Sequence, residues 1–327
     1  MPYEAGQLEQ VAAMVAQRRT VFANPFKSLS ASRRAPCRAR PLRLALALML
    51  AQGAFAVRAE AGESPWVQAG AAEVRLVSTG PGDAASPFGD AALEIRLDEG
   101  WHTYWRFPGE AGIPTSADFG ASSGLTLARL RFPPPARYSD PYATSLVYHD
   151  RIVLPIDLVP AVGETAPVLR AHVSFGICRE ICVPGEASLE LPLAEGGPDF
   201  AARLAISAAR AALPRPQDEA PPRIAGIEHR QLAPAEGKAP QKAPQETFVI
   251  TAELASPDAP VDLFAEGAEG SYNEVPRLLE RNGRFARFAL PATGLAANGD
   301  GTRPLVLTLV EGDIAVEHRA ALPPAGN

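Results

Sequence analysis

The sequence predicts an all-β protein made of two immunoglobulin-like β-sandwiches, joined by a short helix and a linker. Segments in which every second residue is apolar recur along the chain after Trp66. Glycine and proline, 27 and 33 of the 327 residues, separate these segments. Short strands at this spacing are typical of a sandwich. The hydrophobic content of 46% is sufficient for two cores.

The first sandwich is predicted between residues 63 and 195. Leu93, Ile95 and Leu97 alternate with charged residues, as expected of a strand with one buried face. The predicted strands lie at 74–76, 93–97, 125–132, 152–158, 168–175 and 187–193.

A helix and a linker are predicted next, over residues 196–222. Asp199 can cap the first turn, the Ala-rich stretch 201–213 forms the helix, and Pro214 ends it. The rest of this segment is the linker. Residues 233–245, rich in Ala, Pro, Lys and Gln, are predicted to form a mobile loop or a second linker.

The second sandwich is predicted over residues 223–325. Asn282-Gly283 is a strong hairpin signal, and Gly312 indicates a second hairpin. The predicted strands lie at 248–254, 261–264, 277–280, 284–290, 305–310 and 314–318. This part has no cysteine and no recognisable catalytic cluster, so we predict a spacer or docking module.

Residues 1–60 are predicted to be a targeting segment. Arginines precede an apolar run at 44–50, and Ala54-Phe55-Ala56 is a small-x-small cleavage site. The run is shorter than the about 20 apolar residues of a membrane span. We therefore predict an exported protein, cleaved near Ala56, whose mature chain has no membrane span.

Cleavage would make the protein more acidic and leave two cysteines. Residues 1–56 contain eight Lys/Arg and two Asp/Glu, so 23 basic and 35 acidic residues remain and the net charge becomes −12. Such a surface disfavours nucleic acid and anionic lipid as partners. Cys37 would be lost, whereas Cys178 and Cys182 would remain in an oxidising compartment that permits a disulfide.

The segment 175–186 carries both remaining cysteines, Cys178 and Cys182. Extended chain would separate their Cα atoms by about 13 Å, whereas a disulfide requires about 5.5 Å, so the chain must turn between them. Closing so short a loop contributes only about 2 kcal/mol, against about 4 to 5 kcal/mol for a hundred-residue loop. Stability is thus a weak reason for the pair, and redox chemistry is a serious one.

The spacing leaves three functions open. Thiol–disulfide exchange needs an accessible sulfur and a second one to resolve the mixed disulfide; Arg179 would favour a thiolate and Glu180 would oppose it. A structural disulfide in a non-enzymatic binding or assembly module is the second possibility. Copper binding by two thiolates is the third, but all three Met residues lie at or before position 49 and no His has a familiar ligand spacing. We predict no metal and no cofactor.

Two further segments contain candidate site residues. The aromatic segment 101–107 reads Trp-His-Thr-Tyr-Trp-Arg-Phe. Alternation would bury some of these rings in the core. A lid over a reactive disulfide would also need bulky side chains, and Pro141-Tyr142 could supply one from a loop.

Several motifs follow one another in an order that resembles a known family. They are GWHTYWRFPG at 100–109, AGIP at 111–114, Tyr148, Leu154-Pro155, and Cys178-x-x-Ile181-Cys182-Val183-Pro184 with Glu186. Over approximately residues 65–193 the sequence resembles the N-terminal periplasmic domain of the thiol:disulfide interchange protein DsbD, in particular the branch called suppressor of copper sensitivity protein B. The remainder looks like the second immunoglobulin-like part of that branch.

The resemblance implies a periplasmic, immunoglobulin-like domain whose cysteine pair accepts electrons and passes them to thioredoxin-fold partners. By position, Cys178 and Cys182 match the redox pair. The residues that match the lining and the cap of the family's site are Tyr104, Trp105 and Arg106 in the aromatic strand and Asp140, Pro141 and Tyr142 in a loop.

The sequence departs from the family in two respects. The cysteines of the better-known DsbD domain are further apart, and its aromatic cap residue aligns with Pro141, which leaves Tyr142 as the candidate lid. Full-length members of the family also carry a membrane domain and a thioredoxin-like domain, which supply the cysteine pair with electrons. We recognise neither domain in this sequence, so we expect a separate membrane thiol-reductant transporter as electron donor. The leading prediction is a protein thiol–disulfide oxidoreductase module; a structural-disulfide module and a copper-tolerance protein are the alternatives.

Overall fold

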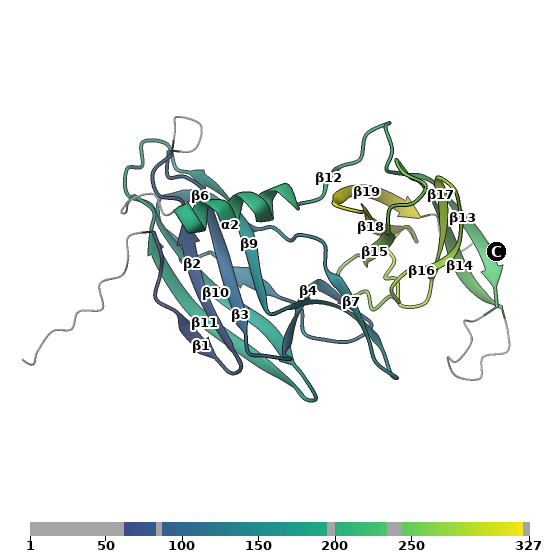
Figure 1. Cartoon of the computed structure of the whole chain (residues 1–327), viewed down its shortest axis with the longest axis horizontal. Helices are drawn as coiled ribbons and strands as arrows, with labels where there is room; N and C mark the ends of the chain where they lie inside the picture. The colour runs from purple at the N-terminus through teal and green to yellow at the C-terminus, as the bar shows by residue number, and fades with distance from the viewer. Residues whose placement is uncertain (1–61, 83–86, 195–199, 234–243, 323–327) are drawn as a thin grey trace, which may run out of the picture. The chain divides into compact units, whose positions relative to one another are not determined.

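The computed structural model describes residues 62–82, 87–194, 200–233 and 244–322, which belong to one compact unit, Arg58–Asn327. They form four β-sheets and one helix (Figure 1). The predicted mainly β class is confirmed. The targeting segment 1–60 and its cleavage site at Ala56 lie outside the described residues.

Two of the four sheets, which we call the first pair of sheets, are built from residues 67–192. The first sheet has the order β1-β2-β3-β9-β6, with strands β1 (Val67–Ala69), β2 (Ala72–Ser78), β3 (Ala91–Leu97), β6 (Leu125–Leu130) and β9 (Arg151–Pro160). The second has the order β11-β10-β4-β8-β7, with β4 (His102–Gly109), β7 (Ala136–Ser139), β8 (Thr144–His149), β10 (Val168–Cys178) and β11 (Cys182–Pro192). A short strand, β5 (Ser116–Asp118), also pairs with β10.

The first pair of sheets encloses one core. Alternate side chains of a strand point to one face, so the apolar residues of each sheet meet those of the other. Leu93 and Ile95 of β3 and Phe175 and Ile177 of β10 are all at most 1% exposed and belong to the same cluster. The six strands predicted for this part of the chain are confirmed.

The helix α2 (Phe200–Ala211) covers the outer face of the first sheet. Ala202 and Ile206 are buried against Val77 of β2 and Ala92 of β3. The helix predicted over residues 201–213 is thus confirmed, and it ends at Ala211, two residues earlier than predicted. Asp199, the predicted cap, lies outside the described residues.

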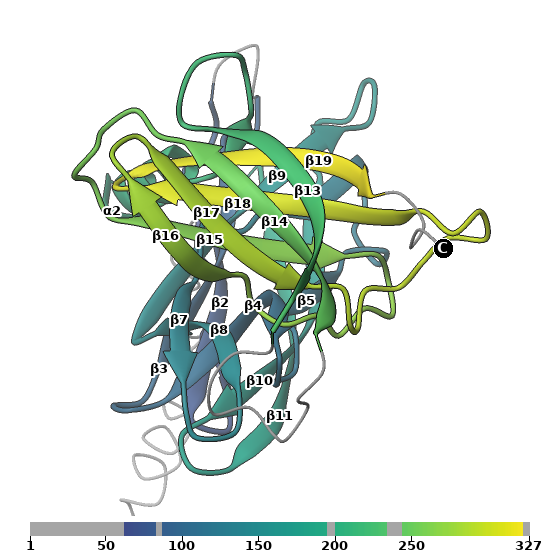
Figure 2. The same ribbon diagram turned by 90° about the vertical axis from the view of Figure 1, so that its right-hand side faces the viewer.

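The other two sheets, which we call the second pair of sheets, are built from residues 215–322. The third sheet has the order β12-β19-β18-β15, with β12 (Arg215–Pro216), β15 (Val261–Gly267), β18 (Arg303–Glu311) and β19 (Ile314–Leu322). The fourth has the order β13-β14-β17-β16, with β13 (Arg223–Leu232), β14 (Gln245–Glu253), β16 (Arg277–Asn282) and β17 (Phe285–Pro291); Figure 2 shows β14, β17 and β16 side by side. Both predicted hairpins, at Gly283 and Gly312, are confirmed.

Two strands of the second pair of sheets were not predicted. β12 lies in the predicted linker and pairs in parallel with β19 over two residues, too few to leave an alternating pattern. β13 is an edge strand that buries Ile224 and exposes most of its polar residues, so its sequence lacks a continuous apolar face. Most of the predicted loop 233–245 lies outside the described residues.

Candidate functional site

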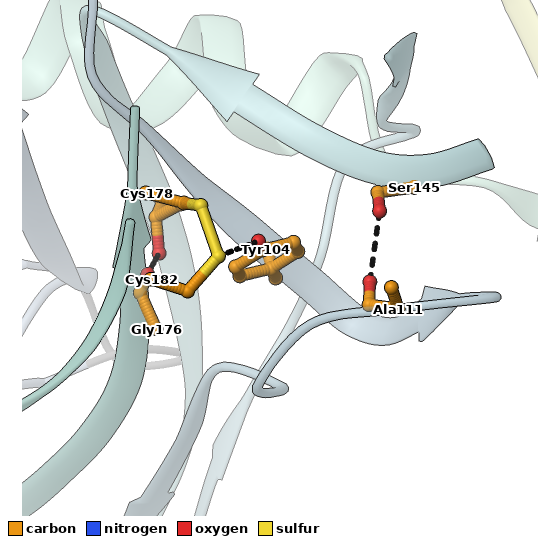
Figure 3. Close-up of a disulfide and its surroundings, with 7 residues drawn as sticks. Tyr104, Ala111, Ser145, Gly176, Cys178 and Cys182 are labelled. Atoms are coloured by element: carbon orange, nitrogen blue, oxygen red, sulfur yellow. Dashed lines mark hydrogen bonds between the residues drawn. A yellow bond between two sulfur atoms is a disulfide. The ribbon is translucent and has the colours of Figure 1, made fainter. Parts of the chain in front are cut away.

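Cys178 and Cys182 close the hairpin between β10 and β11 (Figure 3). The two strands pair along their whole length, and Cys178 lies directly opposite Cys182. Their sulfur atoms are bonded, and their Cα atoms are 4.1 Å apart. The turn predicted between the two cysteines is therefore confirmed.

The two cysteines differ in accessibility. Cys178 is 7% exposed and lies in a small buried cluster with Tyr104 and Val147. Cys182 is exposed and begins β11, which is an edge strand of the second sheet. Ile181, in the turn, is 73% exposed. A second protein can therefore reach the disulfide from the side of Cys182.

Tyr104 is the polar neighbour of the disulfide. Its hydroxyl lies 3.1 Å from the Sγ atom of Cys182, within hydrogen-bond distance for sulfur, as Figure 3 shows. Burial, followed by the charge of Asp140 and by Tyr138, raises the pKa of Tyr104 above its ordinary value. The phenol is therefore neutral at neutral pH and can donate its proton to a sulfur that carries negative charge.

Two glycines hold the ring of Tyr104 in place. A Cβ atom at position 176 would lie 2.8 Å from the ring, and one at position 112 would overlap it. Gly112 also has a φ of +127°, which L side chains rarely adopt. Any larger residue at either position would have to displace the ring, so the glycines are needed for the contact between Tyr104 and Cys182.

Hydrogen bonds fix the segment that carries Gly112. The Oγ atom of Ser145 donates to the carbonyl of Ala111 at 2.8 Å, as Figure 3 shows. The backbone N–H of Gly176 donates to the carbonyl of Ile113 at 3.2 Å. On the other side, the hydroxyl of Thr103 donates to the carbonyl of Gly176 at 2.7 Å. The backbone around Tyr104 is thus held from both β8 and β10.

Replacement of Gly176 by alanine is expected to push the Tyr104 ring away from the disulfide. Overpacking of this kind costs about 1–3 kcal/mol of the free energy of unfolding. The variant should also be reduced faster by a small thiol, because the ring no longer covers the sulfurs. Urea unfolding and the rate of reduction by dithiothreitol measure both effects.

Gly226→Ala is the matched control for this variant, because a Cβ atom at position 226 would meet no atom within 4 Å. Its free energy of unfolding and its rate of disulfide reduction should differ little from those of the wild type. A Gly176→Ala protein as stable and as slowly reduced as the Gly226→Ala protein would contradict the proposed role of Gly176.

Two residues predicted to line the site lie elsewhere. Trp105 follows Tyr104 on β4 and so points to the opposite face, where it is fully buried in the core of the first pair of sheets. Arg106 donates to Glu266 at 2.7 and 2.6 Å and to Glu317 at 2.8 Å. Neither side chain lines the disulfide, because Trp105 packs in the core and Arg106 belongs to an ion-pair network.

The predicted cap loop is a tight turn between β7 and β8. The Oδ1 atom of Asp140 accepts hydrogen bonds from the N–H groups of Tyr142 and Ala143, and these bonds lower the pKa of Asp140. Pro141 is exposed and Tyr142 is 94% exposed. In this structure Tyr142 therefore does not cover the disulfide, and Tyr104 is the aromatic residue beside it.

Sequence reasoning did not assign a role to His102, His149 or Tyr138. His102 lies opposite Cys178 on the neighbouring strand, and His149 lies opposite His102. The ring of Tyr138 is 4.6 Å from that of His102, centroid to centroid. The signal that brings them together is strand register, which no local pattern reveals.

Arg179, which was weighed as a stabiliser of a thiolate, lies instead over the ring of Trp101, with 5.6 Å between the guanidinium carbon and the ring centroid. In the described part of the chain, no three His, Cys, Asp or Glu side chains gather as a possible metal site. None of the helices within the described ranges has the length and apolar character that a membrane crossing requires.

The fold and the site define a β-sheet domain with an accessible disulfide at the end of a hairpin. Residues 81–194 match the family model described as thiol:disulfide interchange protein DsbD, N-terminal. The match includes Tyr104, Cys178 and Cys182, and it confirms the predicted resemblance over this segment. No curated protein matches the chain significantly.

A solved structure shares the fold. It is the crystal structure of the N-terminal periplasmic domain of ScsB from Proteus mirabilis, with a TM-score of 0.61 and 18% sequence identity. The match covers 81% of this chain and 100% of that chain. The likeness therefore extends beyond residues 81–194 and includes strands from the second pair of sheets.

Proposed function

We propose that the Cys178–Cys182 pair exchanges electrons with thioredoxin-fold proteins. The observation that carries this proposal is the asymmetry of the disulfide: an exposed Cys182 with the Tyr104 hydroxyl at its sulfur, bonded to a buried Cys178. Exchange requires an accessible sulfur and a second sulfur beside it that can resolve the mixed disulfide. The match of residues 81–194 to the DsbD N-terminal family supports the same chemistry and the same class of partner.

The proposed reaction begins at Cys182. A partner thiolate attacks its Sγ atom, the Cys178–Cys182 bond breaks, and the electron pair of that bond stays on Cys178 as a thiolate. The second thiolate of the partner then attacks the partner's own sulfur in the mixed disulfide and releases Cys182. The pair has gained two electrons and two protons, and the partner has become a disulfide. The reverse sequence with another protein disulfide passes the electrons on.

Tyr104 assists the proposed reaction at Cys182. In the disulfide form the Cys182 sulfur lies 3.1 Å from the Tyr104 hydroxyl, so a Cys182 thiolate released at this position would accept a hydrogen bond from Tyr104. A hydrogen bond to a charged group is stronger than one between neutral groups. Tyr104 would therefore stabilise the Cys182 thiolate and keep it reactive toward the next partner.

The architecture proposed for this function is two immunoglobulin-like β-sandwiches in an exported, periplasmic protein. We place the first domain at 63–195, the helix and linker at 196–222 and the second domain at 223–325. A separate cluster of buried residues, all between Ile224 and Leu322, supports the second domain. The similar ScsB domain is periplasmic, which supports this compartment.

The reduction potential of the pair tests the proposed function. Equilibration with a thioredoxin-fold dithiol protein should give a value within the range of exchange proteins, about −120 to −270 mV, whereas structural disulfides lie below about −300 mV. A value in the lower range, with no transfer of electrons to or from that protein, would favour a structural disulfide. Titration of the reduced protein with Cu(I) separates the third alternative, copper binding, from both.

A further inference from the structure

A row of four side chains crosses the second sheet beside the disulfide. Cys182 of β11 lies opposite Cys178 of β10, Cys178 opposite His102 of β4, and His102 opposite His149 of β8. Residues directly opposite each other on antiparallel strands point to the same face, with Cβ atoms about 5 Å apart. The row therefore places one imidazole next to the buried cysteine and a second imidazole beyond it.

His102 is enclosed although it lies on the outer face of the sheet. It is 3% exposed, because the ring of Tyr138 lies 4.6 Å from its own ring and those of Tyr104 and His149 lie 5.5 and 5.7 Å away. Burial, and after it the neighbouring His149, lowers the pKa of His102 below 6.5. At neutral pH the imidazole is neutral, and one of its nitrogens can accept a proton.

Cys178 needs such a group. In the reduced protein its thiol would be buried, and burial in apolar surroundings raises the pKa of a thiol. When the pair is oxidised again, Cys178 must attack as a thiolate. A proton acceptor beside the buried sulfur would supply that thiolate at neutral pH.

We propose, building on the exchange function above, that His102 accepts the proton of the Cys178 thiol when the reduced pair is reoxidised. Cys182 first forms a mixed disulfide with a partner protein disulfide. The Cys178 proton then moves to His102, and the Cys178 thiolate attacks the Sγ atom of Cys182. The Cys178–Cys182 bond forms, the mixed disulfide breaks, and its electron pair leaves on the partner sulfur, which takes up a proton as His102 returns its own to solvent.

The groups that face His102 determine when its imidazole can hold an extra proton. The Cys178 thiolate would stabilise a positive charge on His102, whereas a positive charge on His149 would oppose it. Tyr104, on the same strand, stays uncharged because its pKa is raised, and the exposed Asp140 acts on Tyr104 and not on His102. Tyr138, from β7, covers the ring. His102 should thus hold a proton only while Cys178 is a thiolate.

The closing step, in which Cys178 attacks the mixed disulfide at Cys182, tests this proposal. At neutral pH, the reduced His102→Gln protein should react with oxidised glutathione at Cys182 as fast as the wild type does, but it should release the glutathione about a hundredfold more slowly, the lower end of the rate effect of a positioned proton acceptor. The difference should disappear at high pH, where solvent removes the thiol proton. Equal rates of release from the folded wild-type and His102→Gln proteins at neutral pH would overturn the proposal. The measurement needs no thioredoxin-fold protein, so its outcome is independent of whether exchange with such proteins is observed.

A second measurement follows the reactivity of Cys178 directly. In the Cys182→Ala protein, alkylation of Cys178 at neutral pH should slow by about a hundredfold when His102→Gln is added, because the thiol loses its proton acceptor. His172→Gln is the matched control: His172 lies on β10 six residues from Cys178, about 20 Å along the strand, and contacts Ser188. An unchanged rate of alkylation in a folded His102→Gln protein would also overturn the proposal.

Discussion

Replacement of Cys178 by alanine is expected to trap the protein in mixed disulfides with its partners. The remaining Cys182 is exposed on an edge strand and can attack a partner disulfide, but Cys178 is no longer present to release the partner. The partner used is a thioredoxin-fold protein that keeps one active-site cysteine, activated as a mixed disulfide with a small thiol, so that the partner cannot release the adduct either. Non-reducing electrophoresis should show an adduct of the two chains that disappears on reduction.

Cys182→Ala is the matched variant, since it also keeps one cysteine. Its Cys178 is only 7% exposed in the intact protein, so we expect at least about tenfold less adduct, because exchange depends on access to the sulfur. Equal amounts of adduct from the two variants would show that Cys182 is not the entry point. If neither variant forms an adduct, the result would count against exchange itself.

Replacement of Tyr104 by phenylalanine is expected to slow exchange by about tenfold, since a hydrogen bond to a charged group is worth about 1.5–3 kcal/mol and 1.4 kcal/mol corresponds to a factor of ten. The variant keeps the ring between Gly112 and Gly176 and loses only the hydroxyl at the Cys182 sulfur. In the reduced protein the pKa of the Cys182 thiol should rise, because its thiolate loses a donor. The pH dependence of the ultraviolet absorbance of the thiolate measures this change.

Tyr148→Phe provides the control for Tyr104→Phe. Its hydroxyl, on the neighbouring strand β8, donates to the carbonyl of Pro133 at 2.6 Å and faces the core. Loss of that hydroxyl should lower the free energy of unfolding and leave the Cys182 thiol pKa unchanged. If both tyrosine variants shift the thiol pKa equally, Tyr104 has no particular role at the sulfur.

Local sequence patterns predicted most of the strands and the turn between the two cysteines at the centre of the site. Alternating apolar residues, as in β3, give six strands of the first pair of sheets, and Asn282-Gly283 gives a hairpin. The spacing of Cys178 and Cys182 required a turn, which the structure contains. Each of these depends on residues close together in the sequence, so each could be predicted.

The remainder of the site depends on contacts between distant segments. The pairing of β4 with β10 brings His102 opposite Cys178, and no periodic pattern specifies that register. Trp105 was assigned to the site by its position in the aromatic strand of the family, but it follows Tyr104, and neighbouring strand residues point to opposite faces. The different exposure of the two cysteines follows from the position of β11 at a sheet edge, which is a property of the whole sheet.

Strand β4 performs two tasks within three residues. Tyr104 serves the disulfide, while Arg106 binds Glu266 and Glu317, which come 160 and 211 positions later in the chain. Loss of either carboxylate would remove one of the two counter-ions of a partly buried guanidinium, two residues along the strand from Tyr104. The strand that supports the proposed exchange at Cys182 is consequently held in place by acidic residues from the second pair of sheets.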